Sequence, residues 1–217
     1  MERFKDRQEV GKKLAQKLLS LKGQSPLVLP LVRGGIVVGY EIALALDGEL
    51  EPFFSKKIGH PNSPEFAIAA LTAGGTLVQN PNWVSSVDPV WFEKTVSQTQ
   101  KLIQERAQKL LKRPLRKSLE GQTVIVCDDG IATGLTMEAA LKECRGMRPK
   151  KLILAVGVAP EATLDRLKNF CDDIVTVYTA PPHTCFQAVG QFYQNFPQVE
   201  DEEVLEITQK FLDRIKK

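Results

Sequence analysis

One segment in the middle of the chain constrains the fold more than any other: an apolar run followed at once by two carboxylates and a loop of small and hydroxyl residues. Val124–Cys127 is apolar and rich in β-branched residues, which is typical of a buried strand. Asp128 and Asp129 follow it, residues 130–136 read Gly-Ile-Ala-Thr-Gly-Leu-Thr, and Met137–Cys144 has the pattern of a helix. The order of strand, acid pair, loop and helix predicts a unit of an open α/β sheet.

This order also predicts the kind of ligand. Ligands of open α/β sheets bind at the carboxyl ends of the strands, and the free N–H groups of a helix N-terminus hold phosphate. Asp128 and Asp129 offer acceptors for sugar hydroxyls, and the loop beside them offers a cradle for a phosphate. A sugar 5-phosphate fits both parts.

Other folds with paired acids compete with this interpretation. A Rossmann-like strand can end on two acids by chance. Receiver domains carry paired acids near their start, whereas Asp128 and Asp129 lie in mid-chain, and haloacid-dehalogenase-like enzymes place their acids two positions apart. Neither of these last two folds needs the loop, and the Thr-Gly-x-Thr sequence that ends at Thr136 is hard to explain by chance.

The stretch Val124–Thr136 resembles the signature of the type I phosphoribosyltransferases, which bind phosphoribosyl pyrophosphate. The resemblance implies that Asp128 and Asp129 hold the ribose 2- and 3-hydroxyls and that the loop Ala132–Thr136 surrounds the 5-phosphate. It also implies a Mg²⁺ ion that the two acids reach mostly through ribose hydroxyls or water. The phosphoribosyl pyrophosphate site implied in this segment comprises Asp128, Asp129, Gly130, Ile131, Ala132, Thr133, Gly134, Leu135 and Thr136.

A second candidate loop follows the first predicted core strand, Leu27–Leu31. Arg33 offers a planar guanidinium that suits phosphate oxygens, and Gly34 and Gly35 let the backbone approach a ligand closely. The loop resembles the pyrophosphate loop of the same family, which often reads Pro-Arg-Gly-Gly where this chain has Val32 before the arginine. We therefore expect this loop to hold pyrophosphate.

Lys56 and Lys57 follow the second predicted strand, residues 50–55. The family places a basic residue here that contacts pyrophosphate, and after it a mobile loop that closes over the reacting centre. A cation stabilises the departing pyrophosphate, and closure excludes water. The alternative is a pair of surface lysines at a strand end. The family pattern favours Lys57, and it predicts a flexible loop over residues 56–80. The implied catalytic set is Lys57, Arg33, Asp128 and Asp129.

Residues 57–70 and the aromatic residues of 186–196 resemble one branch of the family, the stand-alone predicted phosphoribosyltransferases of bacteria, whose substrate is not firmly assigned. The chain departs from that branch at Ala69, where glycine is expected, and at Asn195, where aspartate is expected. Ala132 stands where purine-salvage members often carry an aspartate that handles a base proton, which argues against the hypoxanthine–guanine type of acid–base help. The roles of His60 and of segment 186–196, in substrate contact or in packing and solvation, stay open.

Strand-like and helix-like segments alternate along the chain, which predicts a parallel sheet flanked by helices. The resemblance implies the α/β type I phosphoribosyltransferase fold: a central parallel five-stranded sheet with a small β-hairpin flap and a hood. We expect one domain over residues 1–217, with hood elements from 1–25 and 180–217. Further expected elements are helices over 4–22, 36–46, 88–112, 161–170 and 201–216, strands over 152–158 and 174–178, a hairpin of 66–72 with 76–79, and a loop over 56–65.

Charge and composition narrow the range of possible functions. A net charge of +3 over 217 residues is too small to predict nucleic-acid binding, and no apolar run is long enough to span a membrane. The first residues are charged and lack a signal-peptide core, so we expect a cytoplasmic protein. The four cysteines form no Cys-x-x-Cys pair, which argues against a structural zinc site. The family resemblance adds the expectation of a homodimer.

The leading hypothesis is a phosphoribosyltransferase that uses phosphoribosyl pyrophosphate and Mg²⁺ to ribosylate a nucleobase-like nitrogen acceptor, with release of pyrophosphate. The alternative is a regulatory protein that binds phosphoribosyl pyrophosphate or a nucleotide without turnover. A third possibility is phosphate transfer from, or hydrolysis of, a related sugar phosphate. The sequence does not identify the acceptor.

Overall fold

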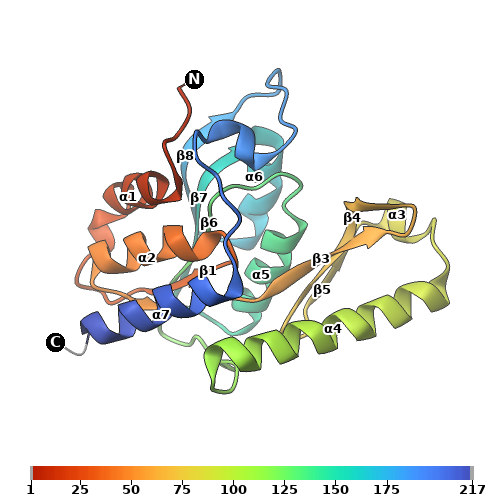
Figure 1. The fold of residues 1–217 in the computed structure, drawn as a ribbon, viewed down its shortest axis with the longest axis horizontal. Coiled ribbons are helices and arrows are strands. Elements are labelled where there is room, and N and C mark those ends of the chain that lie inside the picture. The colour runs from red at the N-terminus through yellow and green to blue at the C-terminus, as the bar shows by residue number, and fades with distance from the viewer. Residues whose placement is uncertain (1, 216–217) are drawn as a thin grey trace.

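A five-stranded parallel sheet forms the centre of the protein, whose computed structural model describes residues 2–215 (Figure 1). The strand order is β2-β1-β6-β7-β8, and every neighbouring pair runs parallel. The strands are β1 (Leu27–Pro30), β2 (Glu49–Leu50), β6 (Thr123–Asp128), β7 (Lys151–Pro160) and β8 (Asp173–Ala180). The parallel five-stranded sheet expected from the sequence is confirmed.

Helices cover both faces of this sheet, because alternate residues of a strand point to opposite sides. Ile125 and Cys127 of β6 belong to the core cluster on one face, and Val124 and Val126 belong to the cluster on the other. The first face carries α1 (Arg7–Lys17), α2 (Gly35–Leu46) and α7 (Asp201–Ile215), and the second carries α5 (Leu135–Gly146) and α6 (Glu161–Leu167). Burial on both faces explains why the strands are continuously apolar.

A smaller antiparallel sheet extends to the right of the main sheet in Figure 1. Its strands are β3 (Ser55–His60), β4 (Ser63–Thr72) and β5 (Leu77–Gln79), and they are followed by α3 (Pro81–Val84) and the long α4 (Pro89–Leu111). The pairing of β4 with β5 confirms the hairpin predicted for residues 66–72 and 76–79.

The prediction of a loop over residues 56–65, within a flexible loop over 56–80, is wrong as to secondary structure. Lys56 and Lys57 lie in β3 and pair with Leu71 and Ala70 of β4. The polar, proline-containing composition suggested a loop, but the buried Ile58 anchors β3 in a small apolar cluster beneath α4. This pairing between strands overrides local composition. The mobility of the segment stays a prediction.

Two other predicted boundaries are corrected. The strand expected over residues 50–55 is reduced to the two-residue β2, although the Glu51 and Phe53 amides still donate to the Val28 and Pro30 carbonyls at 3.0 and 2.8 Å. The helix expected over 4–22 is α1 followed by a short 3₁₀ turn, Leu19–Leu21. It begins at residue 7 because the Asp6 carboxylate caps it, accepting a hydrogen bond from the Glu9 amide at 2.8 Å.

The remaining helices follow the predictions closely. Asp88 caps α4 as expected by accepting a hydrogen bond from the Trp91 amide at 2.8 Å. Helix α6 continues as a 3₁₀ turn, Lys168–Phe170, and another such turn, Val189–Phe192, interrupts the irregular stretch before α7. The predicted last helix included residue 216, which lies outside the described residues. Within residues 2–215, no helix is both long and apolar enough to cross a membrane.

Candidate functional site

The two predicted ligand loops meet at one edge of the main sheet. Strands β1 and β6 are neighbours, with Pro30 opposite Cys127, so the loop after β1 and the acid pair after β6 emerge side by side. A cavity of about 450 Å³ lies there. Its walls come from the loop after β1, the acid pair, α1 and the segment before α7. They comprise Arg7, Leu31, Val32, Arg33, Gly34, Asp128, Asp129, Phe196, Pro197, Gln198 and Val199.

The glycines of the first loop allow this close approach. A Cβ atom on Gly34 would lie 2.2 Å from Oδ2 of Asp129, and one on Gly35 would lie 3.0 Å from the Cys127 carbonyl oxygen and 3.1 Å from Oδ1 of Asp128. Any side chain at Gly34 would therefore displace the acid pair. The Gly35 amide already donates to the Leu31 carbonyl at 3.0 Å, so Gly35 supplies room and not a free donor.

The two acids are not equivalent. Asp128 is partly exposed, and its Oδ1 accepts a hydrogen bond from the Asp129 amide at 2.8 Å, whereas Asp129 is only 7% exposed. The protein around the Asp128 carboxyl still removes much of its hydration, and this desolvation raises the pKa of Asp128 well above its ordinary range; the neighbouring charge of Asp129 adds to the shift. Burial also raises the pKa of Asp129, although the guanidinium of Arg7 opposes that shift. The pair therefore resists carrying two negative charges.

Sequence reasoning missed Arg7, the residue that holds Asp129. Nε of Arg7 donates to Oδ2 of Asp129 at 2.6 Å, and a second guanidinium nitrogen donates to the Pro197 carbonyl at 2.6 Å. The guanidinium carbon lies 3.7 Å from the centroid of the Phe196 ring. A charged residue in the first turn of an amphipathic helix gives no sign of such a partner, so only the fold could reveal it.

The loop after the acid pair presents free backbone donors. The Ala132 carbonyl accepts a hydrogen bond from the Thr163 hydroxyl at 2.9 Å, and the Thr133 carbonyl accepts one from Arg166. Because each peptide is planar and trans, the N–H groups that follow these carbonyls point away from α6. Among residues 2–215, no acceptor binds the amides of residues 132–136, and Thr133 is exposed. The loop is thus open to an anion at the N-terminus of α5.

The predicted basic residues lie in different places. Arg33 lines the cavity, and its guanidinium is hydrogen-bonded to the Glu200 carboxylate. Lys57 instead bonds Glu65 across the β3–β4 hairpin, at 2.7 Å, and both side chains are solvent-exposed. Neither Lys56 nor Lys57 is among the residues that line the cavity. The structure therefore brings Arg33, Gly34 and the acid pair together, and leaves the two lysines on the smaller sheet.

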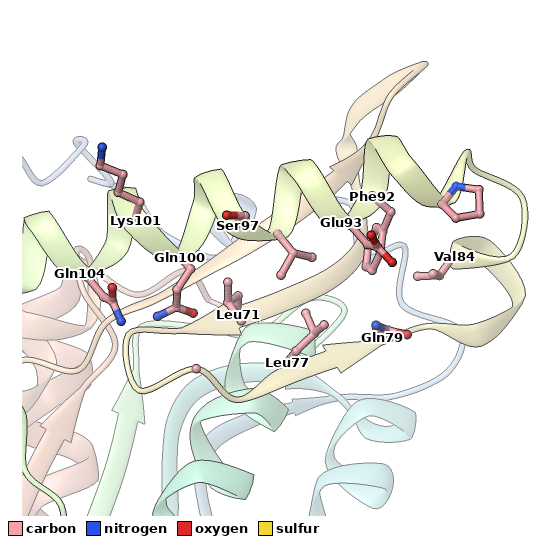
Figure 2. A pocket seen from close by; sticks show the side chains of 13 residues that line it. Leu71, Leu77, Gln79, Val84, Phe92, Glu93, Ser97, Gln100, Lys101 and Gln104 are labelled. Atoms are coloured by element: carbon pink, nitrogen blue, oxygen red, sulfur yellow. The ribbon is translucent and has the colours of Figure 1, made fainter.

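A larger cavity, of about 830 Å³, lies between α4 and the β4–β5 hairpin (Figure 2). Leu71 and Leu77 of the hairpin and Phe92 of α4 give it an apolar lining, and Gln100 and Gln104 of α4 point toward it. It contains none of the predicted site residues. Size alone does not make it the better candidate, because it lacks the paired carboxylates and the free amides found at the sheet edge.

No group of three or more histidine, cysteine or acidic side chains is arranged to hold a metal ion within the part of the chain that the structure describes. The acid pair offers carboxylate oxygens at the cavity. This donor set suits a hard cation that takes most of its ligands from a phosphorylated substrate and water.

Comparisons with known proteins identify relatives of this chain by sequence and by structure. A sequence model of the phosphoribosyl transferase domain matches residues 2–183. A protein of Mycobacterium tuberculosis, provisionally named a phosphoribosyl transferase in strains CDC 1551 and H37Rv, is 35% identical over 216 residues, which are 99% of this chain and 47% of that protein. The chain thus spans about half the length of the curated relatives that it matches. The crystal structure of TT1426 from Thermus thermophilus is 36% identical, with a TM-score of 0.78 over 96% of this chain and 99% of that one.

Proposed function

Because this chain belongs to the phosphoribosyl transferase domain family, we propose that it transfers the phosphoribosyl group of phosphoribosyl pyrophosphate to a nitrogen of a nucleobase-like acceptor. One observation carries the proposal: the acid pair and the Arg33 loop line one cavity at a single sheet edge, and the loop of free amides follows the acid pair directly along the chain. Sugar hydroxyls, a terminal phosphate and a diphosphate are the three groups of this substrate that need partners, and the three features match them in kind.

The pentose and its 5-phosphate would bind at β6 and the start of α5. Asp128, which is partly exposed at the cavity, would accept hydrogen bonds from the ribose hydroxyls. The amides of residues 132–136 and the hydroxyls of Thr133 and Thr136 would bind the 5-phosphate. Helix α5 begins here, so its positive N-terminal end favours the phosphate charge.

The pyrophosphate would bind at the loop after β1. Arg33 supplies the cation, and the Gly34 amide donates to no acceptor among the described residues. Lys56 and Lys57 would have to reach this group from the smaller sheet, and Lys57 would have to release Glu65. We therefore assign the first contact to Arg33 and keep Lys57 as a partner that joins on closure.

Asp128 and Asp129 would hold Mg²⁺ through ribose hydroxyls or water. When bound, the ion would neutralise negative charge on the leaving group. The residues fit this role, because the acid pair supplies hard oxygen donors without forming a complete metal cage.

The reaction would break the bond between C1 of the ribose and the pyrophosphate oxygen and form a bond between C1 and the acceptor nitrogen. By analogy with glycoside hydrolysis, positive charge develops on the sugar in the transition state. Asp128 would place negative charge near it once it has released its proton. Ala132 cannot take a proton from the acceptor, so the acceptor must lose its proton without help from that position.

Residues from the N-terminal and the C-terminal part of the chain cover the cavity. This arrangement supports our proposal of one domain over residues 1–217, with a hood built from residues 1–25 and 180–217. Arg7 comes from α1, and Phe196, Pro197, Gln198 and Val199 come from the segment that precedes α7. The acceptor would enter beside this cover.

The test is a pyrophosphate-release assay with phosphoribosyl pyrophosphate, Mg²⁺ and a panel of purines, pyrimidines and pyridine carboxylates. We expect acceptor-dependent release with at least one compound, and loss of that release in Asp128→Asn. Binding of phosphoribosyl pyrophosphate without release across the panel would contradict transfer and support the regulatory alternative.

A further inference from the structure

The ion pair between Arg7 and Asp129 is the best-buried charged contact beside the cavity. Arg7 is 8% exposed and Asp129 is 7% exposed, and Nε and Oδ2 are 2.6 Å apart. A buried ion pair contributes little net stability, because removing two charges from water costs about as much as their attraction returns. Stability alone therefore does not account for an arginine at this place.

Arg7 also occupies an unfavourable position in its helix. It is the first residue of α1, where the helix dipole disfavours a positive charge. Three contacts offset this: Asp129, the Pro197 carbonyl at 2.6 Å, and the Phe196 ring at 3.7 Å from the guanidinium carbon. All three partners line the cavity with Arg7 itself. The guanidinium thus ties the acid pair to the segment that covers it.

The backbone around Asp129 is fixed from the other side. The Tyr193 hydroxyl donates to the Asp129 carbonyl at 2.6 Å, and a Cβ on Gly157 of β7 would lie 2.3 Å from that same oxygen. Asp129 is therefore held at its carboxylate by Arg7 and at its carbonyl by Tyr193. Asp128 makes no ion pair among residues 2–215: its Oδ1 accepts a hydrogen bond from the Asp129 amide, and its carboxyl interacts with that of Asp129.

We propose that Arg7 is a positioning residue that fixes Asp129 and so leaves Asp128 as the acid that meets the incoming pentose. This assignment rests on the proposed function and deepens it, because it divides two roles that the acid pair would otherwise share. Arg7 acts through Asp129, whose amide donates to Oδ1 of Asp128 at 2.8 Å. It does not touch the sugar.

A double-mutant cycle tests the division of roles. Calorimetry would measure the Kd of phosphoribosyl pyrophosphate with Mg²⁺ for wild type, Arg7→Met, Asp129→Asn and their combination. Outer-shell groups that fix the ligands of a metal site typically contribute about 10- to 100-fold in affinity, and Arg7 would act on Asp128 in the same indirect way, through Asp129. We expect each single change to weaken binding by about 10-fold and the combination to weaken it no further, because both changes break one contact.

Controls separate positioning from folding. Arg7→Lys keeps the positive charge but not the planar guanidinium with its several donors. We expect it to recover part of the affinity lost in Arg7→Met. Arg3→Met removes an exposed arginine four positions earlier and should leave the Kd unchanged. Each Kd is measured on protein shown to be folded by circular dichroism, and Arg7→Lys carries the test if Arg7→Met fails to fold.

The outcomes are distinct. Wild type that does not bind phosphoribosyl pyrophosphate overturns the proposed function and this assignment with it. Wild type that binds, with affinity unchanged in Arg7→Met or in the less disruptive Arg7→Lys, overturns the assignment alone. Losses that multiply in the Arg7→Met, Asp129→Asn combination overturn it as well, because the two residues would then act independently.

Discussion

The guanidinium of Arg33 is hydrogen-bonded to the carboxylate of Glu200, so the cation that we assign to pyrophosphate is already paired with an anion of the chain itself. The next residue, Asp201, accepts two hydrogen bonds from Nε of Arg106 on α4, at 3.0 and 3.1 Å. The start of α7 is thereby joined both to the loop after β1 and to the helix of the smaller sheet.

Glu200→Gln should tighten the binding of pyrophosphate, because Arg33 would no longer have to exchange one anion for another. The Arg33 and Glu200 side chains are 33% and 55% exposed, and a surface pair of this kind is worth about 1 kcal/mol or less, so we expect a gain of up to about fivefold. Titration calorimetry with pyrophosphate at low and high salt would measure it. Glu203→Gln, a neighbouring exposed acid, should bind like wild type.

Gly34→Ala should both destabilise the protein and abolish binding of phosphoribosyl pyrophosphate. The new Cβ would collide with Oδ2 of Asp129 at 2.2 Å, and such overpacking costs about 1–3 kcal/mol of the free energy of unfolding. Gly146→Ala is the matched control, since its Cβ meets nothing within 4 Å and its φ is not positive. Urea unfolding should find Gly146→Ala at least as stable as wild type. Equal stability of both variants would contradict the packing at Gly34.

Asp128→Asn should stabilise the unliganded protein, and increasingly so as the pH rises. Burial raises the pKa of Asp128 above its ordinary 3.8, so the fold favours the protonated acid. That stabilisation is complete below about pH 4 and is lost as the pH rises through the raised pKa of the folded state, where the unfolded chain has already released its proton. The asparagine cannot ionise and keeps its contribution. Urea unfolding of both proteins across this range should show a difference that grows with pH, and a constant difference would contradict it.

Thr163→Val should weaken the binding of ribose 5-phosphate. The valine removes the hydroxyl that donates to the Ala132 carbonyl at 2.9 Å and helps turn the loop amides outward. A hydrogen bond of this type contributes about 1 kcal/mol, so we expect a loss of about fivefold, measured by calorimetry. Thr95→Val removes a comparable hydroxyl-to-carbonyl bond on α4 and should not change the affinity.

Much of the central fold could be predicted because its signals are local. Val124–Cys127 is apolar on both faces, and Asp88 and Pro89 mark the start of α4, so these elements follow from adjacent residues. The β3 strand could not be recognised in this way. Lys56 and Lys57 leave only Ile58 as an apolar anchor, and β3 exists because β4 pairs with it.

The same distinction between local and long-range signals applies to the candidate site. Residues 128–136 and the Arg33 loop stand in contiguous motifs, so the sequence predicted them together. Arg7 and Glu200 contact that site from positions far from their partners along the chain, and no local pattern links them. Long-range ion pairs depend on the packed fold, so they cannot be predicted from patterns of adjacent residues.

The central claim is that Asp128 binds the pentose of phosphoribosyl pyrophosphate, and calorimetry on Asp128→Asn tests it most directly. A hydrogen bond to a charged group contributes about 1.5–3 kcal/mol, so we expect the affinity for phosphoribosyl pyrophosphate with Mg²⁺ to fall by about 10-fold or more. Asp173→Asn, at the opposite end of the parallel sheet, should bind like wild type. Wild type that binds the ligand no more tightly than Asp128→Asn would contradict the account.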